Sequence, residues 1–354
     1  MRAAFVTGPM HIELRDVPTP QVPDDGLLLA VRACGVCGSD LRRWREGPVH
    51  DSAPLIAGHE ISGVVEAVGP RTVGYRVGER LAVAPDVHCG TCWYCERGLF
   101  NLCDSLRLVG ITPGLDGGFA DHLVLPAAVL AGGVVHRVPE TLTPEQAALT
   151  EPLSSVLASH EGAGTALGDT VVVMGAGPIG CLHLAVARAR GARVILSEPS
   201  APRRALAERF GPDLIVDPTT EDVEASVRRA TDGRGADVVI CANPVAATHA
   251  QAVRMVRKRG TVVLFGGLPK ADPVTALDGN LIHYGEIRVV GSFSYHPSFH
   301  SRALAAIERG TIDSNLVITH TFALDEVEEA FRVAADGGAL KVMVTIDGSW
   351  EAGS

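Results

Sequence analysis

Three separated segments of the chain carry side chains that commonly bind a transition-metal ion. Cys37 lies in the segment 33–40, His59 and Glu60 are adjacent, and Glu151 lies much further along the chain. One thiolate, one imidazole and one carboxylate suit zinc and leave a fourth coordination position open. An alcohol oxygen can take that position, and the metal then lowers the pKa of the alcohol. These residue types suggest a catalytic zinc site, although their spacing alone is only suggestive.

Simpler interpretations compete with this hypothesis. Cys34 and Cys37 form a Cys-x-x-Cys motif, which also occurs in thiol oxidoreductases. A redox pair of that kind should open a helix in a small βαβ fold, so we weigh it below the zinc site. A lone histidine such as His59 is usually a structural residue. Its position beside Glu60, after Gly58, favours a ligand role here.

A second cysteine group has a spacing that is much more specific. Four cysteines follow one another with gaps of two, two and seven residues: Cys89, Cys92, Cys95 and Cys103. Four thiolates on one short segment can surround one zinc ion as a tetrahedron and leave no position for water. We therefore predict a structural zinc site. Four reduced core cysteines, or a nucleic-acid-binding zinc ribbon, are the weaker alternatives.

A glycine-rich loop predicts a dinucleotide cofactor. An apolar run at 171–174 leads into the loop residues Gly175, Ala176, Gly177, Pro178, Ile179 and Gly180. A strand before this motif and a helix after it are the required context. The first glycine permits the tight turn, the second lets the backbone approach the pyrophosphate, and the third lets the helix pack against the sheet. The free N–H groups of the helix then face the phosphates.

Glu198 ends the next predicted strand and favours NAD over NADP. An acidic residue there binds the ribose hydroxyls, and it would repel a 2′-phosphate. Arg203 and Arg204 follow and weaken this preference slightly, and Arg203 is counted among the cofactor-binding residues. The alternative is that Glu198 is only a solvated strand end.

The elements around these motifs predict an α/β protein with two domains. Short apolar runs punctuated by Gly and Pro make the first 150 residues β-rich and barrel-like. Strands then alternate with amphipathic helical segments, which indicates a doubly wound parallel sheet. The strands are expected at 170–174, 193–197, 214–217, 236–242, 260–266 and 287–291, and the helices at 178–190, 201–210, 223–231 and 246–258.

The last part of the chain is expected to complete the first domain. Helices at 302–309 and 324–335 and a strand at 340–346 follow the end of the alternating pattern. We therefore predict a discontinuous catalytic domain of residues 1–153 and 296–354, with a cofactor domain of residues 154–295 between its parts. At 354 residues, the chain has the length of about two domains.

Composition limits the classes of partner. The formal net charge is −10 and no basic run is present, which argues against nucleic acid or an anionic membrane as the main partner. The N-terminal segment does not resemble a secretory signal, and no apolar run approaches the roughly 20 residues of a bilayer span. Clustered cysteines in a long chain without such a signal favour metal sites over disulfides. We expect a cytoplasmic protein.

Taken together, these motifs resemble the zinc-containing medium-chain alcohol dehydrogenases over nearly the whole chain. The ordered set comprises Gly58-His59-Glu60 with Gly63 and Gly69, the four-cysteine segment, Glu151-Pro152-Leu153 and the glycine loop. Within that superfamily the chain is most similar to the sorbitol/L-iditol dehydrogenase branch, through residues 151–153, 266–269 and 280–287. The resemblance implies a GroES-like catalytic domain, a Rossmann domain, two zinc ions per chain and a homo-oligomer, a tetramer or dimer.

The resemblance also implies roles for particular residues. Cys37 and His59 would bind the catalytic zinc, and Glu60 and Glu151 would compete for the remaining protein position. Ser39 would pass the alcohol proton toward the cofactor ribose, and Asp40 would orient His59. Four residues correspond to positions where the family's backbone lies along the nicotinamide: Gly266, Gly267, Ser292 and Phe293.

Two positions depart from the family pattern. Thr72 stands where a small or aliphatic residue is expected. Arg42 stands where some members carry the histidine that ends the proton relay, which leaves the exit of the proton open.

Three functions remain in view. The leading hypothesis is an NAD-dependent zinc dehydrogenase that oxidises a secondary alcohol of a polyol, cyclitol, aminocyclitol or sugar to a ketone. The second is an amino-alcohol dehydrogenase of the L-threonine 3-dehydrogenase kind, which an acidic pocket facing the substrate amine would favour. The third is a non-catalytic binding protein, which the complete set of zinc ligands disfavours.

Several other residues are considered as substrate contacts. His296 and His300 lie near the expected domain junction, where a role as plain hinge-loop residues is favoured over substrate contact. Trp44 and His50 follow Cys37 and are weighed as pocket residues with no preference either way.

Overall fold

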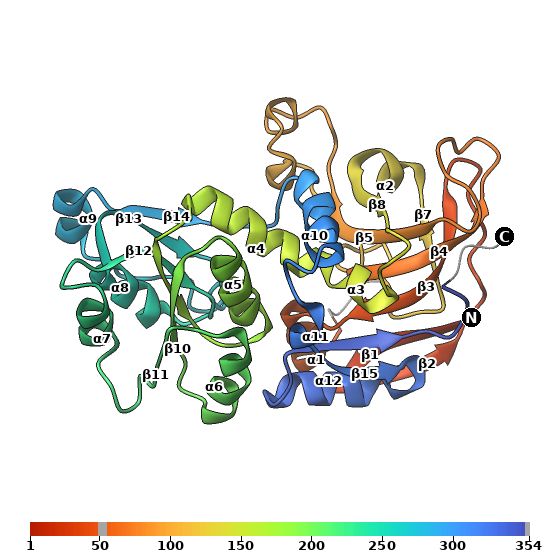
Figure 1. The fold of residues 1–354 in the computed structure, drawn as a ribbon. Coiled ribbons are helices and arrows are strands. Elements are labelled where there is room, and N and C mark those ends of the chain that lie inside the picture. Colours follow the sequence, from red (N-terminus) through yellow and green to blue (C-terminus); the bar gives the residue numbers. More distant parts are fainter. Residues whose placement is uncertain (49–54, 351–354) are drawn as a thin grey trace. The chain divides into compact units, whose positions relative to one another are not determined.

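The computed structural model describes residues 1–48 and 55–350, which form two compact units (Figure 1). The first unit comprises Met1–Ser154 together with the chain from Ser294 onward, and the second comprises Ser155–Phe293. None of the helices in the described ranges has both the length and the apolar character that crossing a membrane requires.

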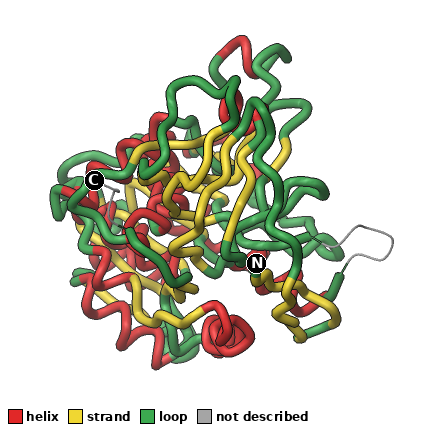
Figure 2. The backbone as a smooth tube through the Cα atoms, turned by 90° about the vertical axis from the view of Figure 1, so that its right-hand side faces the viewer, coloured by secondary structure: helices red, strands yellow, loops and turns green. Residues whose placement is uncertain are grey.

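The first unit is built on an eight-stranded sheet, whose strands run side by side in yellow in Figure 2. Strand β7 (His122–Leu125) pairs with β3, and β8 (Gly133–Arg137) pairs with β5. A separate hairpin joins β1 (Arg2–Gly8) to β2 (His11–Asp16). The main path of the sheet runs in the order β15 (Ile318–Ala323), β16 (Lys341–Thr345), β3 (Leu27–Gly35), β4 (Glu60–Val68), β5 (Arg80–Val87) and β6 (Arg107–Leu108).

The C-terminal part of the chain completes this sheet. Strand β16 pairs antiparallel with β3, with Met343 opposite Gly35 and Thr345 opposite Ala33. The helices of the unit are α1 (Gly38–Glu46), α2 (Ala127–Gly132), α3 (Pro144–Ala148), the start of α4 (Thr150–Ala163), α10 (Ser298–Glu308), α11 (Ser314–Val317) and α12 (Val327–Asp336).

Three aromatic rings pack against one another in the core of the first unit. Trp44 and Phe119 both contact Phe331 edge-on, with ring centroids 6.1 and 5.3 Å away. All three side chains are almost fully buried. Phe331 lies on α12, whereas Trp44 and Phe119 lie in the N-terminal part of the chain. Burial of these rings therefore stabilises the packing of α12 against the N-terminal part of the unit.

The second unit is a six-stranded parallel sheet with helices on both faces. Its strand order is β11 (Leu214–Val216), β10 (Arg193–Ser197), β9 (Thr170–Met174), β12 (Ala236–Cys241), β13 (Val256–Leu264) and β14 (Arg288–Gly291). Figure 1 shows one face covered by α5 (Pro178–Ala189) and α6 (Ala201–Ala207), and the other by α7 (Val223–Ala230) and α8 (Ala246–Met255); a short helix, α9 (Gly279–Gly285), precedes β14.

The strand order reverses beside β9, which is where such sheets bind their cofactor. The predicted α/β fold, with a β-rich unit and a doubly wound parallel sheet, is confirmed. Several boundaries differ from the prediction: α8 ends at Met255 rather than at residue 258, β13 begins at Val256 rather than at residue 260, and α10 begins at Ser298 rather than at residue 302. Val256 already pairs with Ala236, and the Arg257 guanidinium binds the Asp237 carboxylate across the same two strands.

Candidate active site

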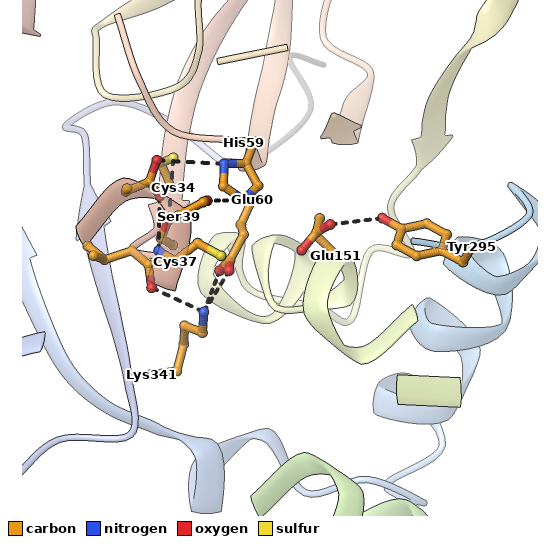
Figure 3. Close-up of polar contacts among 11 residues, drawn as sticks. Cys34, Cys37, Ser39, His59, Glu60, Glu151, Tyr295 and Lys341 are labelled. Atoms are coloured by element: carbon orange, nitrogen blue, oxygen red, sulfur yellow. Dashed lines mark hydrogen bonds and ion pairs between the residues drawn. The ribbon is translucent and has the colours of Figure 1, made fainter. Parts of the chain in front are cut away.

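Cys37, His59 and Glu60 converge at one edge of the sheet of the first unit (Figure 3). One ligand atom from each of the three residues lies within 4.8 Å of the other two. Cys37 is the N-cap of α1, just after β3 ends, and Glu60 begins β4. Since β3 and β4 are antiparallel with Gly35 opposite Glu60, the end of one strand and the start of the other meet at the same edge.

The close approach of Glu60 depends on a glycine. A Cβ atom at Gly35 would lie 1.9 Å from Oε2 of Glu60. The absence of a side chain at Gly35 therefore creates the space that the Glu60 carboxylate occupies.

The Glu60 carboxylate forms a buried ion pair with Lys341. The Lys341 ammonium donates to both Glu60 oxygens, at 2.7 and 2.8 Å, and to the carbonyl oxygen of Val36 at 3.2 Å. Both side chains are almost fully buried. Burial would lower the pKa of Lys341, but the Glu60 carboxylate opposes this and raises that pKa above its ordinary value. Glu60 therefore lies beside Cys37 and His59 with its charge already compensated.

The His59 ring lies between Asp40 and Ser39. Nδ1 of His59 lies 3.6 Å from the Asp40 carboxylate, which also accepts a hydrogen bond from the Cys37 N–H at 3.0 Å. Nε2 lies 3.5 Å from the Ser39 hydroxyl oxygen. Burial would lower the pKa of His59, but the charges of Asp40 and Cys37 raise it well above its ordinary value. A thiol, an imidazole held by a carboxylate, and a further carboxylate form a donor set that fits zinc.

Glu151 lies apart from this group of three ligands. It is the second residue of α4, is 8% exposed, and accepts a hydrogen bond from the Tyr295 hydroxyl at 3.4 Å (Figure 3). Burial raises the pKa of Glu151 to about 8, and the charges of Glu60 and Asp86 act in the same direction, whereas His59 opposes them. Of the two carboxylates left open by the sequence, the structure brings Glu60 beside Cys37 and His59.

The four-cysteine segment forms a second candidate metal centre. The sulfur atoms lie within 4.8 Å of one another, on the loop between β5 and β6: Cys89, Cys92, Cys95 and Cys103. Backbone N–H groups point at these sulfurs, from Cys89 to Cys103 at 3.3 Å and from Thr91 to Cys89 at 3.5 Å. Bonds from Thr91 lower the pKa of Cys89 to about 6, which favours the thiolate. Four sulfurs at this spacing fit a closed zinc site.

The glycine loop in the second unit turns tightly from β9 into α5. Gly175 has φ +111°, which only glycine adopts readily, and Gly177 is the N-cap of α5. Pro178 and Ile179 form the first turn of the helix. A Cβ at Gly180 would lie 1.9 Å from the carbonyl oxygen of Gly175, whereas a Cβ at Gly177 would meet nothing within 4 Å. The turn therefore requires Gly180 for packing and leaves open space beside Gly177.

The Glu198 carboxylate faces the same loop. It lies just after β10, is 3% exposed, and accepts hydrogen bonds from the N–H groups of Ala176 at 2.7 Å and Ser200 at 2.8 Å. The interpretation of Glu198 as a solvated strand end is therefore wrong. An ionised carboxylate accepts about four hydrogen bonds, so two acceptor positions remain for ribose hydroxyls.

The other predicted cofactor residues lie in the second unit. A Cβ atom at Gly266 would lie 2.4 Å from the backbone carbonyl oxygen of Asn243, whereas a Cβ atom at Gly267 would meet nothing within 4 Å. Ser292 follows β14 and donates its N–H to Leu264, and Phe293 is 57% exposed. Arg203 lies in α6, half-buried, two residues beyond its start.

The redox interpretation of the Cys34–Cys37 motif does not fit. Both cysteines are free, and Cys34 is fully buried at the end of β3. Burial raises the pKa of the Cys34 thiol well above its ordinary value, which makes it a poor nucleophile.

The suggested role of Trp44 in the substrate pocket stays a prediction. Trp44 is 1% exposed and belongs to the core, on the same buried face of α1 as Asp40. His50 lies outside the described residues.

The two histidines after Ser294 have separate surroundings. His300 is buried, with Nε2 3.0 Å from the Thr150 hydroxyl and Nδ1 3.1 Å from His136. His296 contacts the Phe100 ring, at 5.2 Å between centroids, beside the cysteine segment.

Three residues near the metal centre were missed by sequence reasoning. Lys341, Tyr295 and Asp86 lie far from Cys37 in the sequence, and none belongs to a local motif. The one available signal was a lysine in a final strand, at 340–346, that is otherwise apolar apart from Thr345. A buried lysine requires a partner.

Comparison with known proteins matches both parts of the chain to zinc-dehydrogenase models. Residues 23–140 match the alcohol dehydrogenase GroES-like domain, and residues 178–309 match the zinc-binding dehydrogenase family. The first match covers the region with both candidate metal centres up to Glu140, and the second begins at Pro178 of the glycine loop.

Several relatives align over almost their full length. The chain is 34% identical to L-threonine 3-dehydrogenase of Pyrococcus furiosus, over 97% of this chain and 98% of that protein. It is 32% identical to sorbitol dehydrogenase of Bacillus subtilis, over 97% of each chain. A zinc-binding dehydrogenase of Sinorhizobium meliloti, solved with NADP bound, has 35% identity and a TM-score of 0.88, over 97% of this chain and 98% of that one.

Proposed function

Since this chain belongs to the zinc-binding alcohol dehydrogenases, we propose that it oxidises a secondary alcohol of a polyol, cyclitol, aminocyclitol or sugar to a ketone, with NAD as the hydride acceptor. The observation that carries this proposal is the convergence of Cys37, His59 and Glu60. Sorbitol dehydrogenase among the relatives supports the polyol class.

The residues of the first unit divide the work at the metal centre. Cys37, His59 and Glu60 would hold zinc, which when bound supplies a Lewis acid that polarises the alcohol oxygen. Asp40 holds the imidazole ring of His59 in place. Ser39, whose hydroxyl lies 3.5 Å from His59 Nε2, would accept the proton of the alcohol and pass it toward the cofactor ribose. The four-cysteine segment would hold the second, structural zinc.

The choice of NAD rests on Glu198. A 2′-phosphate beside this carboxylate would bring like charges together in a site that is 3% exposed. The Sinorhizobium meliloti structure, which binds NADP, supports the nicotinamide class of cofactor and makes the choice between NAD and NADP a point to test.

The second candidate function is an L-threonine 3-dehydrogenase-like reaction. The relative with that name, at 34% identity over 97% of this chain, favours it. A purely binding protein is disfavoured, because a set of zinc ligands complete for catalysis is retained.

We also propose a cytoplasmic homo-oligomer, a dimer or tetramer. Strand β14 is an edge of the parallel sheet in the described part of the chain. An edge strand offers unpaired N–H and C=O groups to a second copy.

Kinetics of NAD reduction over acyclic polyols, inositols, aminocyclitols and threonine test the proposal. We expect one of the first three classes to lead in kcat/KM by about 100-fold. A threonine leader would replace the proposal by the second candidate. No turnover of any alcohol in zinc-loaded protein would contradict both.

A zinc assay separates the two metal centres. Wild type should hold two zinc ions per chain, one for each cluster. Cys37→Ser should lose one ion and lower kcat by orders of magnitude while still binding NAD, and Cys103→Ser should lose the other. Near-normal turnover in Cys37→Ser would overturn the catalytic assignment.

A further inference from the structure

Asp86 lies in an irregular stretch of β5 beside the metal centre. Against β8, Ala84 is opposite Val134 and Val87 is opposite Gly133, so β5 contains two extra residues there, Pro85 and Asp86. Such a bulge turns a side chain away from the regular alternation of the strand, and bulges are frequent beside active sites.

The sheet register places this bulge near His59. Strands β4 and β5 are antiparallel, with Ile61 opposite Val83. The residues just before β4 and the last residues of β5 therefore share one edge of the sheet. In agreement, burial raises the pKa of Asp86 to about 6 while the charge of His59 acts against this rise, and the charge of Asp86 raises the pKa of Glu151.

The Asp86 carboxylate is buried without a cation of its own. It is 5% exposed and accepts a hydrogen bond from the Ser294 hydroxyl through Oδ2. In the part of the chain that the structure describes, no lysine or arginine forms an ion pair with it. A buried carboxylate is ordinarily paired with a positive charge, and Asp86 has no such partner in the described part of the chain.

The cationic side chains near Asp86 have other partners. Glu60, Glu151 and Asp86 are three carboxylates in one region, and the single lysine among them, Lys341, already binds both oxygens of Glu60. His59 is committed to the metal centre with Cys37. Burial raises the pKa of Glu151 to about 8, so Asp86 is the one of these three carboxylates that is both charged at neutral pH and without a lysine or arginine partner.

We propose that Asp86 binds a protonated amino group of the substrate, so that the alcohol oxidised at this centre belongs to an amino-bearing polyol or cyclitol. This inference rests on the proposed function, and it selects among the substrate classes named there. The ammonium donates to the Asp86 carboxylate while the hydroxyl to be oxidised reaches the metal centre. A charged hydrogen bond in a buried site is worth about 10- to 100-fold in binding.

The same surroundings disfavour an amino acid as substrate. Threonine carries a carboxylate beside its amine, and that group would lie near the Asp86 carboxylate, while the Lys341 ammonium is already paired with Glu60. Like charges brought together in a buried site oppose binding. An amino-bearing polyol has the amine without the carboxylate.

Pairs of substrates that differ only in the amine test the inference. The first pair is 2-amino-2-deoxy-D-glucitol and D-glucitol, and the second is scyllo-inosamine and scyllo-inositol. In wild type we expect the amine to exceed its neutral partner in kcat/KM by about 10- to 100-fold in at least one pair. Asp86→Asn should remove that ratio while leaving kcat/KM for the neutral partner within about threefold of wild type.

Two matched variants separate charge from structure. Asp86→Asn keeps an oxygen that accepts from Ser294, whereas Ser294→Ala removes that hydrogen bond, a contact that lowers the pKa of Asp86, and is assayed at pH 8 so that the Asp86 carboxylate stays charged. Ser294→Ala should change both members of a pair by the same factor. Asp325→Asn removes one exposed negative charge elsewhere in the unit and should preserve the amine ratio.

Calorimetric binding to the NAD-loaded protein gives a readout that does not depend on turnover. Tighter binding of the amine in wild type, lost in Asp86→Asn, supports the inference. Equal binding of both partners, or a parallel loss of both in Asp86→Asn, overturns it. Faster turnover of the neutral polyol in wild type also overturns it, but leaves the proposed function intact.

Discussion

The Lys341 ammonium lies 2.7 Å from one Glu60 oxygen and 2.8 Å from the other, in a region that water barely reaches. This pair joins the final strand, β16, to the first residue of β4, across 281 positions of sequence. It fixes the carboxylate that lies beside Cys37 and His59. Its removal should therefore affect the fold and the metal centre together.

Lys341→Met should destabilise the first unit by about 3–5 kcal/mol, because Glu60 would remain buried without a counter-charge. Chemical denaturation and zinc content would measure the two effects. The double variant Glu60→Gln/Lys341→Met should lose less stability than Lys341→Met alone. Lys270→Met, at an exposed position, is the control, and an equal loss in both lysine variants would contradict the role of the pair.

Two glycines of the cofactor loop should respond differently to alanine. In Gly180→Ala the new Cβ meets the Gly175 carbonyl oxygen, so we expect a loss of stability of about 1–3 kcal/mol together with weakened NAD binding. In Gly177→Ala the Cβ has space, so stability should change by at most about 0.5 kcal/mol while NAD affinity falls. Thermal unfolding and NADH fluorescence titration would distinguish them. Unchanged NAD affinity in Gly177→Ala would contradict the prediction that the pyrophosphate of the cofactor lies beside Gly177.

Glu198→Gln should narrow the preference for NADH over NADPH. The amide keeps one oxygen acceptor for the N–H groups of Ala176 and Ser200, but it no longer repels a 2′-phosphate. Dissociation constants for both reduced cofactors, measured in wild type and variant, provide the test. A wild type that already prefers NADPH would show that the role assigned to Glu198 is incorrect.

A buried histidine pair should make the second unit sensitive to acid. Nδ1 of His183 lies 3.2 Å from Nε2 of His160; burial lowers the pKa of His160 to about 3 and that of His183 well below its ordinary value. The unfolded chain takes up protons near the ordinary histidine pKa of about 6.5, whereas the folded unit does not. Stability should therefore fall as the pH drops below about 6.5, by up to about 1.4 kcal/mol per pH unit for each histidine.

Denaturation curves between pH 7.5 and pH 5 would check this slope. His183→Phe should reduce the pH dependence of the unfolding free energy by the contribution of one histidine. His320→Gln, at an exposed position, should leave that pH dependence unchanged. An identical slope in wild type and His183→Phe would exclude the pair as its source.

Local signals were sufficient to predict much of this protein. The turn at Gly175, the helix that follows it and the four-cysteine segment each depend on residues within about one element of one another. The alternation of strands and helices after residue 169 is predicted in the same way, because the hydrophobic periodicity of each segment indicates its own secondary structure.

What could not be predicted depends on contacts between distant segments. The position of Glu60 beside Cys37 and His59 follows from the antiparallel register of β3 and β4 and from the space left by Gly35. The sequence showed Trp44 four residues after Asp40, which is one face of a helix, but not whether that face is buried or lines a pocket. The bulge that contains Asp86 has one local sign, Pro85 within a strand, but its position beside the metal centre follows from the register of β4 and β5.

The pairing of β16 with β3 determines when, during synthesis of the chain, the Cys37–His59–Glu60 centre can be completed. A ribosome completes strands β3 and β4 long before it reaches residue 341, so Glu60 exists for most of synthesis without its cation. The centre of Cys37, His59 and Glu60 therefore matures last, although two of its segments are among the first made. A nascent chain that stops short of β16 carries all three ligands and still lacks the charge that holds one of them in place.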